Sequence, residues 1–309
     1  MDTLATKRVS GIDEAGYGPL LGPLVLARAD FAVVANPDGT APRRVSRGVR
    51  VGDSKKVYPG KNGLARLERT VLGYYLAKND RLPATLRDWL DQDLMPGRVD
   101  RFDALPWYSE RDLALPLAAT REQIDAAAES IRAVADRERF EGFRLAVVAE
   151  TEFNERAATG RNKHEALFDD VCSLIGDRAS GDAAIVVDKL GGRDRYGEML
   201  EGAFPFVTVT MNGERRTESR YTLWLPAGVV DLRFMMKADA KAHAVSLASM
   251  AAKYTREALM TVFNAYWRKR APGVAPTAGY YVDGCRFVEE LAAAGALDVA
   301  SRARMIRRR

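Results

Sequence analysis

The chain has 309 residues, with 47 Lys and Arg against 42 Asp and Glu, a net charge of +5 and a pI of about 9.2. Its length suits one large domain or two modest ones, and the slight basic excess favours anionic partners without specifying one. Only two cysteines (Cys172, Cys285) and two histidines (His164, His243) are present, which excludes a disulfide framework, a cysteine-rich zinc site and a histidine-based metal cluster.

The first predicted strand ends in two adjacent acids. Residues 9–12 are small or apolar, Asp13 and Glu14 follow, and the glycines and proline of residues 16–19 mark a turn. Neighbouring strand residues point to opposite faces, and like charges a few ångströms apart raise each other's pKa unless a cation neutralises them. The stretch is therefore either a strand with a solvated acidic turn, or half of a divalent-metal site beside a glycine loop.

A second strand is predicted over residues 22–34, and the polar, turn-rich residues 36–50 suit a hairpin loop. Residues 51–56 either lead into a helix with a serine cap or aim Lys55 and Lys56 at phosphate. Apolar residues at helical spacing then predict a helix over residues 64–77.

Residues 79–108 carry three prolines between short apolar groups and predict a partly irregular inserted segment. Its aromatic residues are expected in the core rather than on a base-stacking surface: Trp89, Trp107 and Tyr108. A helical pattern follows over residues 120–139, and residues 143–150 predict a strand.

The second half of the chain alternates between strands and helices. A helix over residues 162–175 precedes a short buried strand over residues 183–188 that ends in Asp188. Residues just beyond the carboxyl ends of parallel strands often carry chemistry, although an acid there can also cap the next helix.

The pair Asn212–Gly213 predicts a hairpin turn between strands over residues 206–211 and 220–225. A strand over residues 232–237 then leads past Asp239 into a long helix from residue 242 to about residue 268. An acid near the start of a helix is favoured by the helix dipole alone, so Asp239 has a structural explanation as well as a functional one.

Four acids are thus expected at one edge of a sheet: Asp13, Glu14, Asp188 and Asp239. Such a cluster requires cations, and hard oxygen ligands suit Mg²⁺ or Mn²⁺. Two such ions can activate water and stabilise a leaving oxygen in phosphodiester cleavage. The expected cofactor is therefore a pair of Mg²⁺ or Mn²⁺ ions.

Four sequence blocks, in order, resemble the type 2 ribonuclease H family, which comprises ribonuclease HII and its archaeal and eukaryotic relatives. The opening block is GIDEAGYGP at residues 11–19, and the second is GDSKK at residues 52–56. The third is VDKLG at residues 187–191, and the fourth joins KADA at residues 237–240 to SLASMAAKYTRE at residues 246–257. Together the blocks are specific, whereas each alone is weak.

The resemblance implies a ribonuclease H-like α/β fold, with a mixed central sheet flanked by helices, a mostly helical insertion and C-terminal helices. It implies a metal-dependent endonuclease that cuts the RNA strand of RNA–DNA hybrids, including ribonucleotides embedded in duplex DNA. The four acids become metal ligands and catalytic residues. The residues implied to contact substrate are Gly16, Tyr17, Gly18, Lys55, Lys237 and Tyr280.

The chain departs from the family pattern at three places. Tyr17 replaces the arginine that the family has between two glycines, which removes a positive charge from the loop. Two insertions are expected, at about residues 80–142 and at about residues 212–230. Gly279–Tyr280 is followed by residues 281–283 (YVD) rather than by the usual Pro-Thr or Pro-Ser.

The catalytic domain is expected over residues 1–270, and a C-terminal helical segment with an arginine-rich tail over residues 271–309. The tail is either a solvated end or an attractor of nucleic acid. No apolar run is long enough to span a bilayer and no signal peptide precedes the first strand, so we expect a cytoplasmic monomer without a membrane partner. Two alternatives stay open: a nucleic-acid-binding relative that no longer cuts, and a metal-dependent nuclease for structured RNA.

Overall fold

The computed structural model describes residues 6–34, 51, 63–95, 99–159, 163–178 and 181–308. The strands are β1 (Thr6–Ala15), β2 (Leu24–Val34), β3 (Glu138–Val148), β4 (Ala183–Asp188), β5 (Thr208–Glu214), β6 (Glu218–Leu225) and β7 (Gly228–Met235). The α-helices are α2 (Gly63–Asn79), α3 (Leu86–Asp93), α4 (Val99–Asp103), α5 (Arg121–Arg132), α6 (Glu150–Ala158), α7 (Lys163–Asp177), α8 (Gly197–Ala203), α9 (His243–Arg270), α10 (Tyr281–Ala293) and α11 (Val299–Met305). Two short 3₁₀ helices, η1 (Pro106–Tyr108) and η2 (Ala238–Ala240), complete the described elements.

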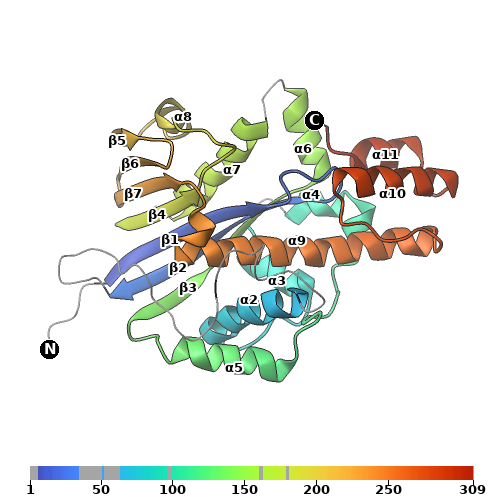
Figure 1. Ribbon diagram of the computed structural model, residues 1–309, viewed down its shortest axis with the longest axis horizontal. Helices are drawn as coiled ribbons and strands as arrows, with labels where there is room; N and C mark the ends of the chain where they lie inside the picture. Colours follow the sequence, from blue (N-terminus) through green and yellow to red (C-terminus); the bar gives the residue numbers. More distant parts are fainter. Residues whose placement is uncertain are drawn as a thin grey trace.

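The strands form one sheet in the order β3-β2-β1-β4-β7-β6-β5. The pairs β1–β4 and β4–β7 are parallel, and the other neighbouring pairs are antiparallel. Helices flank this mixed sheet (Figure 1). The predicted α/β architecture, a mixed central sheet flanked by helices, is confirmed.

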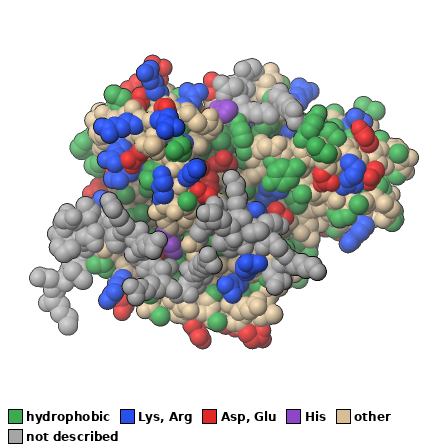
Figure 2. Space-filling view, in the orientation of Figure 1, with side chains coloured by type: hydrophobic (Ala, Val, Ile, Leu, Met, Phe, Trp, Pro, Cys, Tyr) green, Lys and Arg blue, Asp and Glu red, His purple; other side chains and the backbone are tan. Residues whose placement is uncertain are grey.

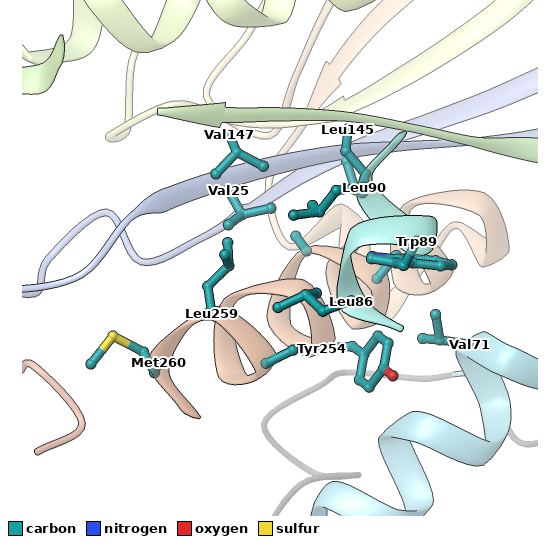
Figure 3. Packing of buried hydrophobic residues seen from close by; sticks show 14 of the residues in the cluster. Val25, Val71, Leu86, Trp89, Leu90, Leu145, Val147, Tyr254, Leu259 and Met260 are labelled. Carbon is teal, nitrogen blue, oxygen red and sulfur yellow. The ribbon is translucent and has the colours of Figure 1, made fainter. Parts of the chain in front are cut away.

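Two apolar cores lie on the two faces of the sheet. The larger core joins β1–β3 to α2, α3, α5 and α9, and Figure 3 shows Trp89 of α3 among its residues. The indole N–H of Trp89 donates to Thr255 of α9 over 2.9 Å, which ties α3 to the long helix. The predicted core aromatics Trp89, Trp107 and Tyr108 are all buried. The smaller core packs α7 and α8 on the other face.

Helix α9 approaches β1 so closely that only glycine fits at residue 11. A Cβ on Gly11 would lie 2.1 Å from the backbone nitrogen of Val245. This close contact fixes the start of α9 against the strand that carries Asp13. Helices α10 and α11 lie beside the far end of α9 (Figure 1), and Phe287 and Met305 belong to the same larger core.

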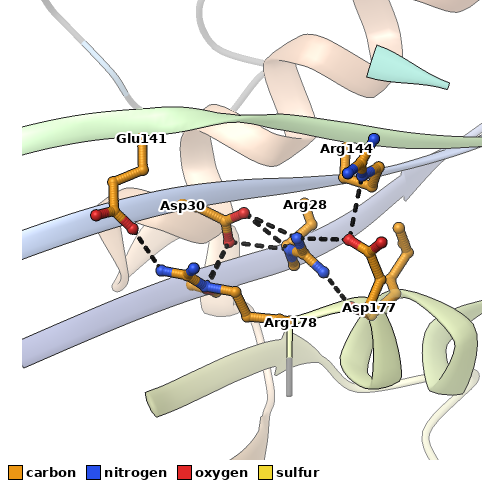
Figure 4. Close-up of polar contacts among 8 residues, drawn as sticks. Arg28, Asp30, Glu141, Arg144, Asp177 and Arg178 are labelled. Atoms are coloured by element: carbon orange, nitrogen blue, oxygen red, sulfur yellow. Dashed lines mark hydrogen bonds and ion pairs between the residues drawn. The ribbon is translucent and has the colours of Figure 1, made fainter. Parts of the chain in front are cut away.

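A buried ionic network holds α7 against β2, away from the carboxyl end of β1. Arg28 pairs with Asp30 and with Asp177 at 2.9 Å each, and Arg178 reaches Glu141 at 2.6 Å (Figure 4). Arg28 is 3% exposed, and its charge is balanced by two carboxylates, which buried charges require. This network positions α7 on the sheet, and it includes none of the four acids expected at the sheet edge: Asp13, Glu14, Asp188 and Asp239.

The predicted hairpin turn at Asn212–Gly213 is wrong. Both residues lie inside β5, where the register shifts between Met211 and Gly213, and the reversal occurs over Arg215–Glu218. The amide of Asn212 donates to Thr222 across the strands over 2.8 Å. A bulge at Gly213, which has φ +153°, accommodates the dipeptide that the sequence pattern assigned to a turn.

Other boundaries also differ from the predictions. The helix expected over residues 120–139 ends at Arg132, because residues from Glu138 onward pair with β2 as β3. The strand expected to reach residue 150 ends at Val148, and Glu150 instead begins α6, where a first-turn acid suits the helix dipole. No helix in the described part of the chain has the length and apolar character to cross a bilayer.

Candidate active site

Asp13 and Asp188 lie at the same end of two neighbouring parallel strands. The register pairs Ile12 with Val187, so Asp13 near the end of β1 and Asp188 at the end of β4 follow directly. Parallel strands present their carboxyl ends at one edge of a sheet, as the sequence suggested for Asp188. The placement comes from the pairing of β1 with β4, in which partners such as Ile12 and Val187 are 175 residues apart in the chain.

Asp13 is 8% exposed and carries a pKa well above its usual range. Burial is the main cause, and the negative charges of Glu14 and Asp188 add to it. A hydrogen bond from Ser249 on α9 and one from the backbone N–H of Glu14, at 2.8 Å, act in the opposite direction. Three carboxyl groups are therefore electrostatically linked at this edge.

Glu14 follows Asp13 on the opposite face of β1, as strand alternation requires. Its charge also acts on Tyr17 of the glycine loop. The pKa of Tyr17 is raised, mainly by burial and secondly by the negative charge of Glu14. The hydroxyl of Tyr17 lies 3.3 Å from Nδ1 of His164 on α7. Tyr17 therefore projects from the glycine loop toward α7 and is half-buried there.

Asp188 is held by the turn that follows β7. The backbone N–H of Ala238 donates to Oδ1 of Asp188 over 2.7 Å. The preceding residue, Lys237, has a left-handed backbone with φ +57°, and its side chain is exposed. Asp239 lies within η2 rather than in the first turn of α9, and its carbonyl oxygen accepts a hydrogen bond from the Ser246 hydroxyl.

The chemistry of these donors suits a hard divalent cation, because all four side chains offer carboxylate oxygens. Burial is the main cause of the raised pKa of Asp13, and the repulsion from Glu14 and Asp188 that adds to it is the kind that a bound cation relieves. Among the described residues, however, no three acidic, histidine or cysteine side chains converge closely enough to hold a metal ion.

Arg307 supports the glycine loop between β1 and β2 through hydrogen bonds to its backbone. Its Nη2 donates to the carbonyl oxygens of Gly16, Tyr17 and Pro19 over 2.7, 3.0 and 2.7 Å. Arg307 is 3% exposed and lies 4.6 Å from the centre of the Phe153 ring. Burial lowers the pKa of Arg307 to about 10, which leaves it cationic at neutral pH.

Arg307 fits neither of the two interpretations of the arginine-rich tail. Arg307 is neither a solvated end nor free to attract nucleic acid, because its charge is buried under the loop. The neighbouring Arg308 is exposed, and its backbone N–H donates to Asn154 over 2.6 Å. The number of arginines in the tail could not show that Arg307 is buried while Arg308 is exposed.

Arg256 and the Gly279–Tyr280 turn support the other side of the loop. The carbonyl of Gly279 accepts hydrogen bonds from the N–H groups of Leu20 and Leu21 over 2.8 and 3.1 Å. The Arg256 guanidinium donates to Leu21 and Ala278 and lies 5.9 Å from the centre of the Tyr280 ring.

Tyr280 itself is 59% exposed. The residues after it have a structural role, since Asp283 accepts hydrogen bonds from Thr277 and from the N–H of Ala278. Of the unusual residues 281–283, Asp283 thus helps to shape the turn that places Tyr280 beside the glycine loop.

Gly16 is required by this arrangement, whereas Gly18 is not. Gly16 has φ +89°, and a Cβ there would lie 2.6 Å from both Nε of Arg256 and the carbonyl oxygen of Pro23. A Cβ on Gly18, which is exposed, would meet nothing within 4 Å. The block at residues 52–56, including Lys55, lies outside the described residues.

A buried acid that sequence reasoning missed lies close to the loop. Glu150 is fully buried at the start of α6, and the hydroxyl of Tyr108 donates to it over 2.9 Å. Burial raises the pKa of Glu150 to about 7, while the charge of Arg307 acts in the opposite direction. The sequence offered no signal for Glu150 beyond an acid at the end of a predicted strand.

No family model matches the chain. It is 37% identical over 93 residues to a ribonuclease HII of Thermococcus onnurineus (strain NA1), a match that covers 30% of this chain and 32% of that protein. The matched stretch thus spans about a third of the length of this curated relative.

Several solved structures are similar at low sequence identity. A chain of the PCNA:RNase HII complex from Archaeoglobus fulgidus has 16% identity and a TM-score of 0.44, with coverage of 97% of this chain and 94% of that chain. Ribonuclease H2 from Pyrococcus horikoshii OT3 has 17% identity and a TM-score of 0.41, with coverage of 97% and 92%. Bst-RNase HIII in complex with Mn²⁺ has 13% identity and a TM-score of 0.41, with coverage of 99% and 67%.

Proposed function

We propose that this chain, whose membership of the type 2 ribonuclease H family is supported by the ribonuclease HII match, is a metal-dependent endoribonuclease. Its substrates would be RNA–DNA hybrids and duplex DNA with embedded ribonucleotides. One observation carries the proposal. Asp13 near the end of β1 and Asp188 at the end of β4 lie on neighbouring parallel strands, and burial together with the charges of Glu14 and Asp188 raises the pKa of Asp13.

Asp13, Glu14, Asp188 and Asp239 would hold two Mg²⁺ or Mn²⁺ ions. When bound, the ions would activate the attacking water and stabilise the departing 3′-oxygen, so that the product carries a 5′-phosphate. Ser249 would keep Asp13 oriented from α9, and the N–H of Ala238 would keep Asp188 oriented from η2. A carboxylate oxygen has more than one lone pair, so an oxygen that accepts a hydrogen bond can also bind a cation.

The glycine loop and Tyr280 would recognise the ribonucleotide. Recognition of the 2′-hydroxyl is what separates RNA from DNA at one site, and backbone groups of a glycine loop can approach that hydroxyl closely. Gly16, Tyr17 and Gly18 would line the approach, with Tyr280 against the ribose and Lys237 near phosphate. Tyr17 brings no charge, and Arg307 holds the loop carbonyls from below instead.

A substrate panel tests the proposal. It would contain an RNA–DNA hybrid, duplex DNA with one ribonucleotide, duplex RNA and duplex DNA, each with Mg²⁺, Mn²⁺ or chelator. We expect metal-dependent cutting of the first two and none of duplex DNA. Cutting of duplex RNA alone would support the structured-RNA alternative, and hybrid binding without cutting would support the non-cleaving alternative.

A further inference from the structure

The outer strands place an arginine turn on the same sheet face as Asp188. The register pairs Asp188 with Met235 of β7, and Met235 with Glu218 of β6. Arg215 and Glu218 close the β5–β6 hairpin through two backbone hydrogen bonds of 3.0 and 3.2 Å. Laterally paired residues point to one face, so Asp188, Met235, Glu218 and Arg215 form one row across the sheet.

The turn is fixed relative to the acidic edge. Lys189, the residue after Asp188, donates from Nζ to the carbonyl oxygen of Arg215 over 2.7 Å and to Asp194 over 2.6 Å. The N–H of Met236 donates to the carbonyl oxygen of Thr217 over 2.9 Å. These contacts join the turn to the residues that directly follow β4 and β7, so it cannot move independently of Asp188.

The two arginines of the turn differ from those on the strands behind them. Arg220 pairs with Glu218 at 2.6 Å and Arg233 pairs with Asp231 at 2.8 Å, which neutralises both guanidinium groups. Arg215 and Arg216 are exposed, and no acidic side chain of the described residues forms an ion pair with either. Figure 2 shows Lys and Arg side chains over the β5–β7 region, with acidic side chains at its inner border.

The spacing suits a nucleic-acid backbone. Three inter-strand steps of about 4.8 Å place Arg215 roughly 14 Å from Asp188 along the row. One strand of a duplex carries a phosphate for every 3.4 Å or so of helix axis, so that distance corresponds to about four nucleotides. A strand held at Asp188 and crossing the outer strands would bring later phosphates to the turn.

We propose that Arg215 and Arg216 form a phosphate clamp that binds the duplex backbone a few nucleotides from the cleaved bond. This proposal rests on the proposed function, because it takes Asp188 as the point where the cleaved phosphate lies. The clamp supplies affinity and register rather than chemistry, since point charges on phosphate carry no sequence information. It gives the β5–β6 hairpin a role in binding substrate.

The test compares two variants that lose the same charge. One is the double variant Arg215→Ala/Arg216→Ala. The control is Arg137→Ala/Arg139→Ala, which removes two exposed arginines at the other end of the sheet, next to and at the start of β3. Affinity for a fluorescein-labelled RNA–DNA hybrid is measured by anisotropy with Ca²⁺ over a series of salt concentrations, beside cleavage with Mg²⁺.

For the clamp variant we expect an affinity about tenfold weaker and a salt dependence whose log–log slope is smaller by about 1.8, since each phosphate contact contributes about 0.9. The control should behave as the wild type, and Arg215→Lys/Arg216→Lys should restore most of the affinity. Equal slopes for the clamp variant, the control and the wild type would overturn the clamp. So would a wild type that fails to bind the hybrid.

The two proposals fail in different ways. If the wild type cuts the hybrid and the clamp variant binds it with an unchanged slope, the clamp is wrong and the proposed function stands. If the wild type binds without cutting and the clamp variant loses slope, Arg215 and Arg216 still bind the duplex backbone. The nuclease assignment is then wrong, and so is the position of the clamp relative to a cleaved bond. Melting temperatures of both variants verify that the folded state is intact.

Discussion

Replacing Arg307 by alanine should loosen the glycine loop and destabilise the fold. The variant loses three hydrogen bonds from Nη2 to the carbonyl oxygens of Gly16, Tyr17 and Pro19, of 2.7 to 3.0 Å. A hydrogen bond to a charged group contributes about 1.5–3 kcal/mol. Burial of the guanidinium offsets part of that sum, so we expect the free energy of unfolding to fall by about 3 kcal/mol.

Arg308→Ala is the matched control, because it removes one charge from the adjacent, exposed residue and retains the backbone hydrogen bond to Asn154. Urea unfolding should show a loss for Arg307→Ala only. Hydrogen exchange of the Leu20 and Leu21 amides, which donate to Gly279, should become faster in the same variant.

Catalytic efficiency should fall because the glycine loop moves. A displacement of about 1 Å in a positioning element can lower a rate about a hundredfold, so we expect kcat/KM of Arg307→Ala to be roughly tenfold to a hundredfold lower. If Arg307→Ala and Arg308→Ala have equal stability and equal activity, buried Arg307 does not support the glycine loop. Equal losses of hybrid affinity in both would instead show that the tail acts as an electrostatic attractor.

Three further predictions concern the same region. Burial raises the pKa of Glu150 to about 7, so the stability from its protonated carboxyl is fully present below about pH 4.5 and should be lost as the pH rises from there to about 7. Glu150→Gln should remove about 3 kcal/mol of that pH dependence in urea unfolding at several pH values. Gly16→Ala should force Arg256 aside and lower both melting temperature and catalytic efficiency, while Gly18→Ala should match the wild type in both assays. Mg²⁺ should raise the melting temperature of the wild type but not of Asp13→Asn, and an equal rise in both would place metal binding elsewhere.

Much of the sheet could be predicted from the sequence because several of its strands are apolar and bounded by turns. The strand ending at Asp188 was predicted with the bounds that β4 has, Ala183–Asp188. The reversal over Arg215–Glu218 was not predicted, because the turn dipeptide Asn212–Gly213 is absorbed as a bulge and the cross-strand pairing continues past it. Local turn chemistry was overridden by the pairing of β5 with β6.

The supports of the site could not be predicted, because they depend on contacts between distant segments. Arg307 reaches the glycine loop across almost the whole length of the chain, and Glu150 is buried beside Tyr108 only once the inserted segment has folded. Neither contact leaves a periodicity or a motif. The acids themselves were found because they follow predicted strands, and their metal-binding role stays a prediction.

The most direct test of the central claim compares two aspartates at opposite ends of β4. Asp188→Asn alters the acidic edge, whereas Asp182→Asn changes an exposed acid that accepts a hydrogen bond from the N–H of Val229. The measurement is the initial rate of RNA-strand cleavage in an RNA–DNA hybrid with Mg²⁺. We predict a loss of at least about a hundredfold for Asp188→Asn and an unchanged rate for Asp182→Asn. A hybrid cut equally fast by both variants would contradict the assignment of this edge as the active site.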